Sequence, residues 1–369
     1  MKFLQINKLY PPHLGGVENV VRDIAASLAS DSSWRSDVLV CQARGRRTEE
    51  DKGGVKIYRA ASWGRLLSLP ISWDFFGLFK KIASHYDLLL IHHPFPLASL
   101  ARLLFLPKKI PVAVWYHSDI VRQKFFSYLV YPFLYLDLKA AKIIFVSSRR
   151  LAEQSQLLKK FIDKCRVIPF GVNVADYQAD YESEVNDIKE KYGRFMLAVG
   201  RLVYYKGYLD LLAALETAPG KLLIIGSGPL EAKLRCVIKK KKLVSKVIII
   251  SSHPANLIPY YQSCEFLVFP SNARTEAFGL VQIEAMACGK PVINTNLPTG
   301  VPEVSRDKES GLTVPVGDPH GLASAITSLW EDKDLLLKLG EQARQRVMTD
   351  FSQDKFKTDL KSALSNILF

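Results

Sequence analysis

The sequence lacks any paired arrangement of cysteines. Its five cysteines are scattered over 369 residues, none forms a CxxC pair, and several lie in apolar runs. An odd number of scattered cysteines disfavours both a disulfide framework and a zinc site, whose ligands recur at short spacings. We therefore expect buried, reduced thiols in a cytoplasmic protein.

Long apolar segments are also missing. The opening residues, MKFLQIN, contain no apolar stretch long enough for a signal peptide and instead suggest a first strand. The nearest candidate for a membrane span, residues 97–115, is interrupted by Arg102, Pro107 and Lys108. A span needs about 20 predominantly apolar residues, so the sequence predicts no transmembrane helix.

Acidic residues are too few to balance the basic ones, with 36 against 50 and a net charge of +14. Such an excess indicates an anionic partner: nucleotide phosphates, nucleic acid or an acidic membrane surface. The lysine run at residues 239–242 has no interleaved aromatics, so nucleic-acid binding is not expected. Two basic, aromatic stretches, residues 75–86 and 122–131, fit either interfacial or core helices. With the net charge, they lead us to expect peripheral attachment to the inner face of an acidic membrane.

What the sequence does contain is an alternation of short apolar strands with helical segments. This alternation predicts the α/β class with parallel sheets, and a chain of this length predicts two domains. A GxGxxG fingerprint is absent, which disfavours NAD binding. Strands are expected at residues 3–6, 38–41, 55–58, 88–92, 112–117, 143–146 and 167–169, and then at 195–202, 222–226, 247–250, 266–269, 291–294 and 311–314.

One stretch, residues 275–291, combines a loop and a helix after a buried strand. Gly279 leaves room for a ligand at the helix start, where unpaired backbone N–H groups favour an anion such as phosphate. Glu284 lies one turn beyond Leu280 on the same face, and Glu276 lies in the preceding loop. By spacing alone, an ordinary amphipathic helix whose acids complement its dipole fits about equally well.

The residues EAFGLVQIEAMACGKPV resemble the Glu-x7-Glu signature of retaining GT-B glycosyltransferases of family four. The resemblance implies two Rossmann-like α/β domains facing across a cleft, with a C-terminal helix that crosses back to the first domain. The domains are then residues 1–178 and 190–350, with residues 351–369 returning, and the boundary falls in the polar, acidic stretch 173–191. The variant motif HSDIVRQ at 117–123 is similar to bacterial O-antigen or exopolysaccharide mannosyltransferases.

Two further motifs gain a role from this resemblance. Gly15 and Gly16 resemble the N-terminal loop that approaches the donor phosphates and the acceptor, although a plain tight turn fits them equally well without it. Arg201 and Lys206, in a GR-L…KG pattern after a strand, are expected to bind the pyrophosphate. Without the family pattern, such a pair is most often two solvated surface cations.

The remaining site residues are also implied by the resemblance. His117 is expected near the anomeric carbon, although a lone histidine at a strand end is more often structural, and Asp119 would orient it or bind acceptor hydroxyls. Glu276 would contact the donor sugar, Glu284 the ribose and His253 the base. The other residues expected at the donor are Phe278, Gly279, Leu280 and Val281, the last three through backbone N–H groups.

The predicted function is transfer of a hexose from a nucleotide sugar, with retention, to a lipid-linked or growing polysaccharide. The expected donor is GDP-mannose, with UDP-glucose or a UDP-amino sugar as the second choice. No cofactor or metal is expected, because the motif loops carry no DxD-like acidic pair. The alternatives are a sugar-nucleotide epimerase, a glycosidase using Glu276 and Glu284, and a non-enzymatic protein that binds an anionic polymer. A glycosidase fits poorly, since its two carboxyl groups must face each other across the scissile bond.

Overall fold

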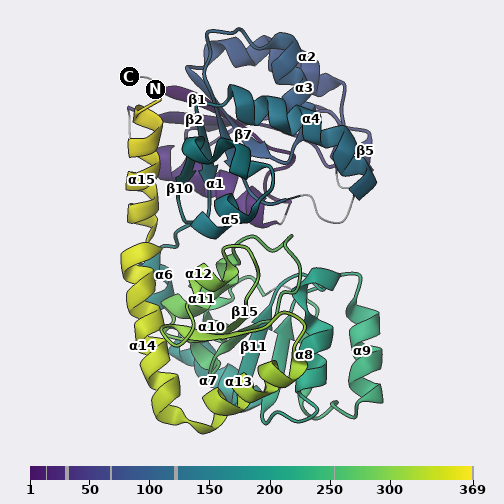
Figure 1. Cartoon of the computed structure of the whole chain (residues 1–369), viewed down its shortest axis with the longest axis vertical. Coiled ribbons are helices and arrows are strands. Elements are labelled where there is room, and N and C mark those ends of the chain that lie inside the picture. Colours follow the sequence, from purple (N-terminus) through teal and green to yellow (C-terminus); the bar gives the residue numbers. More distant parts are fainter. Residues whose placement is uncertain (14, 30–32, 67–68, 120–123, 253, 368–369) are drawn as a thin grey trace. The chain divides into compact units, whose positions relative to one another are not determined.

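The computed structural model describes residues 1–369 except 14, 30–32, 67–68, 120–123, 253 and 368–369, and describes residues 124–129 by their backbone only. The chain divides into two compact units (Figure 1). The first comprises Met1–Ile168 with Lys357–Phe369, and the second Pro169–Phe356. Each is an α/β unit around its own sheet, which confirms the predicted fold class. Among the described residues, every helix is too short or too polar to cross a lipid bilayer.

The sheet of the first unit has eight strands in the order β10-β9-β8-β7-β1-β2-β4-β3. All neighbours are parallel except β3, which is antiparallel to β4. The inner strands are apolar and buried on both faces, as strands covered by helices on two sides must be. Their bounds are Lys2–Ile6 (β1), Arg35–Cys41 (β2), Thr48–Lys52 (β3), Val55–Ala60 (β4), Leu88–His93 (β7), Val112–Tyr116 (β8), Ile143–Val146 (β9) and Cys165–Val167 (β10).

Four short strands of this unit differ from the sequence-based expectation. The exposed strand β3, with the sequence TEEDK, carries no apolar signal, and the strands of the hairpin, β5 (Gly64–Leu66) and β6 (Leu69–Ile71), are too short at three residues each to show a periodic pattern. Strand β10, Cys165–Val167, lies two residues before the expected 167–169, and it ends before Pro169, which has no N–H with which to continue a sheet.

Helices of the first unit bury the apolar faces that the sequence predicts. In α1 (Gly16–Ala29) the residues expected on one side are all buried. Helix α2 (Asp74–Ile82) buries Phe75 and Phe79, so the stretch 75–86 is a core helix and not an interfacial one. The other helical segments are η1 (Ala83–His85), α3 (Pro96–Phe105), α4 (Lys124–Ala140), α5 (Arg149–Gln154) and η2 (Leu158–Lys164).

The second unit has a six-stranded parallel sheet in the order β13-β12-β11-β14-β15-β16. From β11 the chain adds β12 and β13 on one side and then β14, β15 and β16 on the other, so the strand order has its switch point between β11 and β14. Ligands of such sheets bind at the carboxyl ends of the strands at the switch point. The strands are Phe195–Val199 (β11), Lys221–Ile225 (β12), Val247–Ile250 (β13), Leu267–Phe269 (β14), Val292–Thr295 (β15) and Gly311–Val314 (β16).

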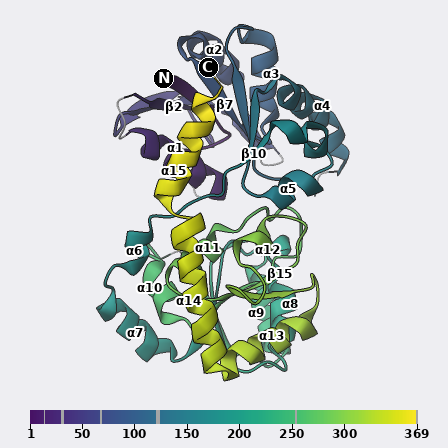
Figure 2. The ribbon, with the colours of Figure 1, turned by 60° about the vertical axis from the view of Figure 1, so that its left-hand side comes forward.

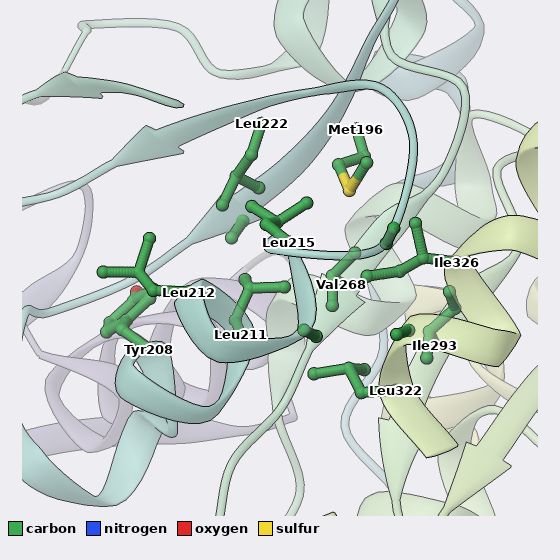
Figure 3. Close-up of a cluster of buried hydrophobic side chains, with 14 of the residues drawn as sticks. Met196, Tyr208, Leu211, Leu212, Leu215, Leu222, Val268, Ile293, Leu322 and Ile326 are labelled. Atoms are coloured by element: carbon green, nitrogen blue, oxygen red, sulfur yellow. The ribbon is translucent and has the colours of Figure 1, made fainter. Parts of the chain in front are cut away.

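A hydrophobic core of this unit joins side chains of the sheet to those of helices α8, α9, α13 and α14. Figure 3 shows Leu211 of α8, Leu215 directly after it and Leu322 of α13 packed near Met196 and Val268 of the strands. The helices are α6 (Val174–Gln178), α7 (Glu182–Tyr192), η3 (Tyr204–Lys206), α8 (Tyr208–Ala214), α9 (Glu231–Lys240), α10 (Ile258–Ser263), α11 (Leu280–Ala287), α12 (Val301–Val304), α13 (Pro319–Glu331) and α14 (Lys333–Asp350).

The division between the units lies at Ile168 and Pro169, earlier than the expected stretch 173–191. Helices α6 and α7 in that stretch belong to the second unit, because Gln262 of α10 donates to the carbonyls of Tyr177 and Ala179 and the apolar side of α7 is buried. The polar and acidic residues of this stretch form the exposed face of α7 and are not a linker. The last helix, α15 (Gln353–Ser365), enters the first unit at Lys357, within the segment 351–369 expected to return.

Candidate functional site

Two loops of the second unit meet at the switch point between β11 and β14. The backbone N–H of Asn272, after β14, donates to the carbonyl of Tyr205, after β11, at 2.8 Å, and the Asn272 side chain donates to Asp210 at 3.1 Å. Gly207 has a left-handed φ of +68°, and a Cβ there would lie 1.8 Å from the Pro270 carbonyl oxygen. Only glycine allows this contact, so the backbone itself fixes the two loops against each other.

These loops bring together two residues that the sequence placed in separate motifs. Lys206 Nζ lies 2.7 Å from Glu276 Oε2, and their side chains are only 13% and 12% exposed. Lys206 Nζ also lies 4.6 Å from the centroid of the Phe269 ring, while Ser271 Oγ donates to Glu276 at 3.3 Å. Burial and the Glu276 charge raise the pKa of Tyr205 to about 12. The site thus contains a preformed ion pair, and the exposed Arg201 is close enough to Tyr205 for its charge to oppose this rise in the Tyr205 pKa.

Helix α11 begins at this site, one residue after Gly279. Gly279 has φ of +83°, and a Cβ there would lie 2.7 Å from the Phe269 ring. The first N–H groups of a helix have no intrahelical acceptor, so the start at Leu280 and Val281 suits an anion. The observed helix, Leu280–Ala287, lies within the stretch 275–291 in which the sequence predicts a loop followed by a helix.

A buried amide network that the sequence reasoning missed holds this helix start. Gln282 donates to the carbonyls of Phe278 at 2.9 Å and Val301 at 3.2 Å. Asn294, on β15, donates to Gln282 Oε1 at 3.0 Å and accepts from Thr313. Buried polar side chains in apolar elements are costly unless paired, which is the one sequence signal that could have found them.

The far end of α11 is fixed by backbone packing against α14. A Cβ on Gly340 of α14 would lie 2.3 Å from the carbonyl oxygen of Gly289, which follows α11. The two helices lie side by side in Figure 2. Both ends of the site helix are therefore held rigidly.

Phe278 has a different place from the one expected. Its ring is buried, with its centroid 5.2 Å from that of Phe170 and 6.1 Å from that of Phe351. The side chain anchors the motif loop within the second unit. A contact between Phe278 and a donor would therefore use its backbone.

Glu284 lies half-buried on α11 and has a tyrosine partner. The Tyr261 hydroxyl, from α10, donates to Glu284 Oε2 at 2.6 Å. Burial, together with the charge of Glu284, raises the pKa of Tyr261 well above its usual value, so this hydroxyl stays protonated as a donor. Tyr261 is a positioning residue that the sequence reasoning did not single out.

In the first unit His117 directly follows β8, the strand next to β7, and the switch point of this sheet lies between β7 and β1. His117 Nε2 lies 2.9 Å from His92 Nδ1, and burial lowers the pKa of His117 to about 3, with the charges of Lys8 and His93 adding to the effect. Asp119 instead accepts from Tyr116 at 2.8 Å and from Ser155 at 2.6 Å. The expectation that Asp119 orients His117 is therefore corrected, because the partner of His117 Nε2 is His92.

The two glycines of the N-terminal loop serve different purposes. A Cβ on Gly15 would lie 2.1 Å from Glu18 Oε2, so the carboxylate of Glu18 occupies the space beside it. A Cβ on Gly16 would meet no atom within 4 Å, which leaves this position open. The remaining predicted contact, His253, lies outside the described residues.

In comparison with known proteins, both halves of the chain match glycosyltransferase family models. The family described as Glycosyltransferase Family 4 matches residues 14–176, and Glycosyl transferases group 1 matches residues 180–346. The chain is 33% identical to O-antigen chain mannosyltransferase C of Escherichia coli over 362 residues, covering 96% of this chain and 95% of that one. It is 31% identical to a D-rhamnosyltransferase of Pseudomonas aeruginosa, with 94% and 91% covered.

Solved structures share the fold at lower identity. Sucrose-phosphate synthase from Thermosynechococcus elongatus superposes with a TM-score of 0.83 at 22% identity, covering 99% of this chain and 98% of that one. An Anabaena protein, HepE, solved in complex with UDP gives a TM-score of 0.79 at 19% identity, covering 99% and 100%.

Proposed function

This chain belongs to the family-four glycosyltransferases of the GT-B fold, and we propose that it transfers a hexose from a nucleotide sugar to a lipid-linked or growing polysaccharide. The observation that carries the proposal is the second unit's switch point. There Arg201, Lys206 and the start of α11 gather the groups that a pyrophosphate requires, with Glu276 beside them. The cations would neutralise the charge that develops as the nucleoside diphosphate departs.

The favoured donor is GDP-mannose, because the relative at 33% identity is named as a mannosyltransferase. The relative at 31% identity, named as a D-rhamnosyltransferase, favours a nucleotide-activated D-rhamnose, whose sugar is mannose without its 6-hydroxyl, as the second candidate. A thermal-shift screen of both, with UDP-glucose and a UDP-amino sugar, separates them. A donor at 100 times its dissociation constant stabilises the protein by about 2.7 kcal/mol. Failure of every donor to bind, and of every sugar to be transferred to a lipid-linked glycan, would refute the proposal.

The reaction is expected to retain the anomeric configuration without a protein nucleophile. Inversion needs a general base opposite the leaving group, and double displacement needs a carboxylate free to attack that face. Glu276 is committed to Lys206 on the side of the phosphate-binding helix start. The departing phosphate is then the base that accepts the acceptor's proton, on the face it leaves. A β-linked product from an α-linked donor, seen from the anomeric proton in NMR, would overturn retention, and a trapped glycosyl–Glu276 adduct would overturn the front-face route.

Turnover is expected to be independent of divalent metal. Arg201 and Lys206 are expected to neutralise the phosphates, which is the role that a metal would otherwise take, and the motif loops lack a DxD-like pair. Activity in excess EDTA should equal activity in Mg²⁺ or Mn²⁺. Loss of turnover in EDTA that either metal restores is the contrary outcome.

Glu284→Ala is expected to weaken nucleotide binding more than it slows the chemical step. The lost hydrogen bond from a charged group costs about 1.5–3 kcal/mol, which is roughly 10- to 100-fold in the dissociation constant of the nucleoside diphosphate. Tyr261→Phe, which removes only the hydroxyl that orients Glu284, should have a smaller effect in the same direction. Isothermal titration of both variants tests this, and unchanged affinity in Glu284→Ala contradicts the ribose role.

Peripheral attachment to an anionic membrane is also part of the proposal, and the β5–β6 hairpin supports it best. Trp63, Leu66 and Trp73, in and beside the hairpin, are 75%, 64% and 72% exposed. Arg65 is also exposed, and its Nη1 lies 3.2 Å from His13 Nε2, in the loop that leads to Gly15 and Gly16. Exposed aromatics with basic neighbours suit an anionic lipid surface, and this one lies beside the loop expected to meet the acceptor.

Substituting serine for both Trp63 and Trp73 is expected to reduce partition onto anionic vesicles at low salt by at least about tenfold. Leu337→Ser is the matched control, because Leu337 is 60% exposed but lies on α14 of the second unit. Partition of the wild type that is equal on neutral and anionic vesicles, or unaffected by the double change, would exclude this surface.

A further inference from the structure

Three buried side chains form a hydrogen-bonded chain across the switch point of the first unit. Gln5 lies on β1, His92 on the neighbouring strand β7, and His117 directly after β8, the next strand. Gln5 Oε1 lies 3.0 Å from His92 Nε2, and His92 Nδ1 lies 2.9 Å from His117 Nε2. The two imidazole planes differ by only 15°, which allows the hydrogen bond to lie near the planes of the nitrogen lone pairs.

The direction of this chain is set at its Gln5 end. Gln5 Nε2 lies 3.2 Å from the Val21 carbonyl oxygen and 2.8 Å from Ser36 Oγ. A carbonyl oxygen can only accept, so the amide nitrogen must face Val21 and the amide oxygen must face His92. His92 Nε2 therefore carries a hydrogen and donates it.

The hydrogen on His92 Nε2 also decides which histidine donates in the His92–His117 hydrogen bond. Burial lowers the pKa of His92 well below its usual value, and the neighbouring His117 and His93 lower it further, so the ring is neutral. With its one hydrogen on Nε2, His92 can only accept at Nδ1. His117 Nε2 must donate to it, and because His117 is also neutral, its Nδ1 carries a lone pair.

We propose that Gln5 and His92 are positioning residues that hold His117 in the Nε2–H tautomer, with Nδ1 as the acceptor nitrogen of its ring. The functional part of this inference rests on the proposed function and on the family resemblance, which implies a place for His117 near the anomeric carbon of the donor. An uncharged acceptor suits that place for two reasons. It can receive a hydroxyl proton of the sugar, and it adds no positive charge beside an oxocarbenium-like transition state.

The tautomer can be tested in the free protein, without any donor. Histidine-selective ¹⁵N labelling and a two-bond ¹H–¹⁵N correlation spectrum near neutral pH distinguish Nε2–H, Nδ1–H and imidazolium rings, with His92→Gln and His117→Gln for assignment. We expect Nε2–H for both rings in the wild type. An Nδ1–H ring or an imidazolium at His117 overturns the inference even if sugar transfer is demonstrated.

Gln5→Met tests whether the amide sets the tautomer, because methionine keeps the length of the side chain and removes the acceptor. We expect a mixture of tautomers at His117 and about a tenfold fall in kcat, the order of one lost hydrogen bond, with the nucleoside diphosphate dissociation constant unchanged. Ser36→Ala is the matched control, since it removes a contact of the same amide but leaves Oε1 toward His92. A folded Gln5→Met with a single Nε2–H tautomer and full kcat would show that Gln5 positions nothing. If no donor is turned over at all, the proposed function fails while the spectrum still decides the tautomer.

Discussion

Lys206→Met is expected to lower kcat by about 100- to 1,000-fold, the range for removing one preorganised group from a developing negative charge. The lysine is the less exposed of the two cations at the switch point, so its charge is screened less by water than that of Arg201. Its removal also leaves the Glu276 carboxylate without its 2.7 Å partner, next to the expected phosphate position. The variant therefore loses the attraction between Lys206 and the phosphate and gains the repulsion between the Glu276 carboxylate and the phosphate.

The double variant Lys206→Met/Glu276→Gln separates these two effects. Breaking the ion pair should cost about 1–3 kcal/mol of stability in the single variant, because it strands a partly buried charge. Neutralising Glu276 as well should recover most of that stability and little of the activity. Unfolding by urea and steady-state kinetics measure the two quantities separately.

A second ion pair of the same unit provides a control. Lys241 pairs with Glu216 at a more exposed position. Exposed pairs contribute about 0–1 kcal/mol, so Lys241→Met should change neither stability nor kcat appreciably. A Lys206→Met enzyme within tenfold of wild-type kcat would remove Lys206 from the phosphate site.

The fold was predictable because strands buried on both faces are nearly continuous apolar runs. Strands β7, β8 and β11 stand out in the sequence for this reason. The exposed strand β3 and the β5–β6 hairpin lack that signal. Amphipathic periodicity was equally ambiguous for residues 75–86, since a core helix and an interfacial helix share it. Only tertiary packing places Phe75 and Phe79 in the core.

The site was predictable as motifs but not as contacts. Sequence indicated Lys206 and Glu276 separately, and their pairing depends on β11 and β14 being neighbours, which strand order decides and periodicity does not. Gln5 and His92 were read as ordinary strand positions. Their signal was weak but physical: a polar side chain in a wholly buried strand needs a buried partner.

Acid is expected to destabilise the first unit before its carboxylates titrate, because His92 and His117 are buried in neutral form. Their folded pKa values lie below the unfolded value of 6.5, at about 3 for His117. The unfolded state therefore binds more protons, so their contribution is complete above pH 6.5 and declines as the pH falls toward the folded values. At pH 4.5 the loss is about 2.7 kcal/mol for His117, and His92 adds a loss of the same sign.

The groups around the pair contribute part of this loss, since the charges of Lys8 and His93 oppose protonation of His117 in addition to its burial. Urea unfolding between pH 6.5 and 4.5, followed by tryptophan fluorescence, measures the decline, because four of the five tryptophans lie in the first unit. His92→Gln should make the pH dependence shallower, whatever its effect on stability at pH 7. The exposed His85, replaced by glutamine, is the control and should leave the dependence as in the wild type. If the free energies of unfolding of the wild type and of His92→Gln fall in parallel with pH, the His92 ring is not held neutral. The assignment of donors and acceptors in the Gln5–His92–His117 hydrogen bonds would then be wrong.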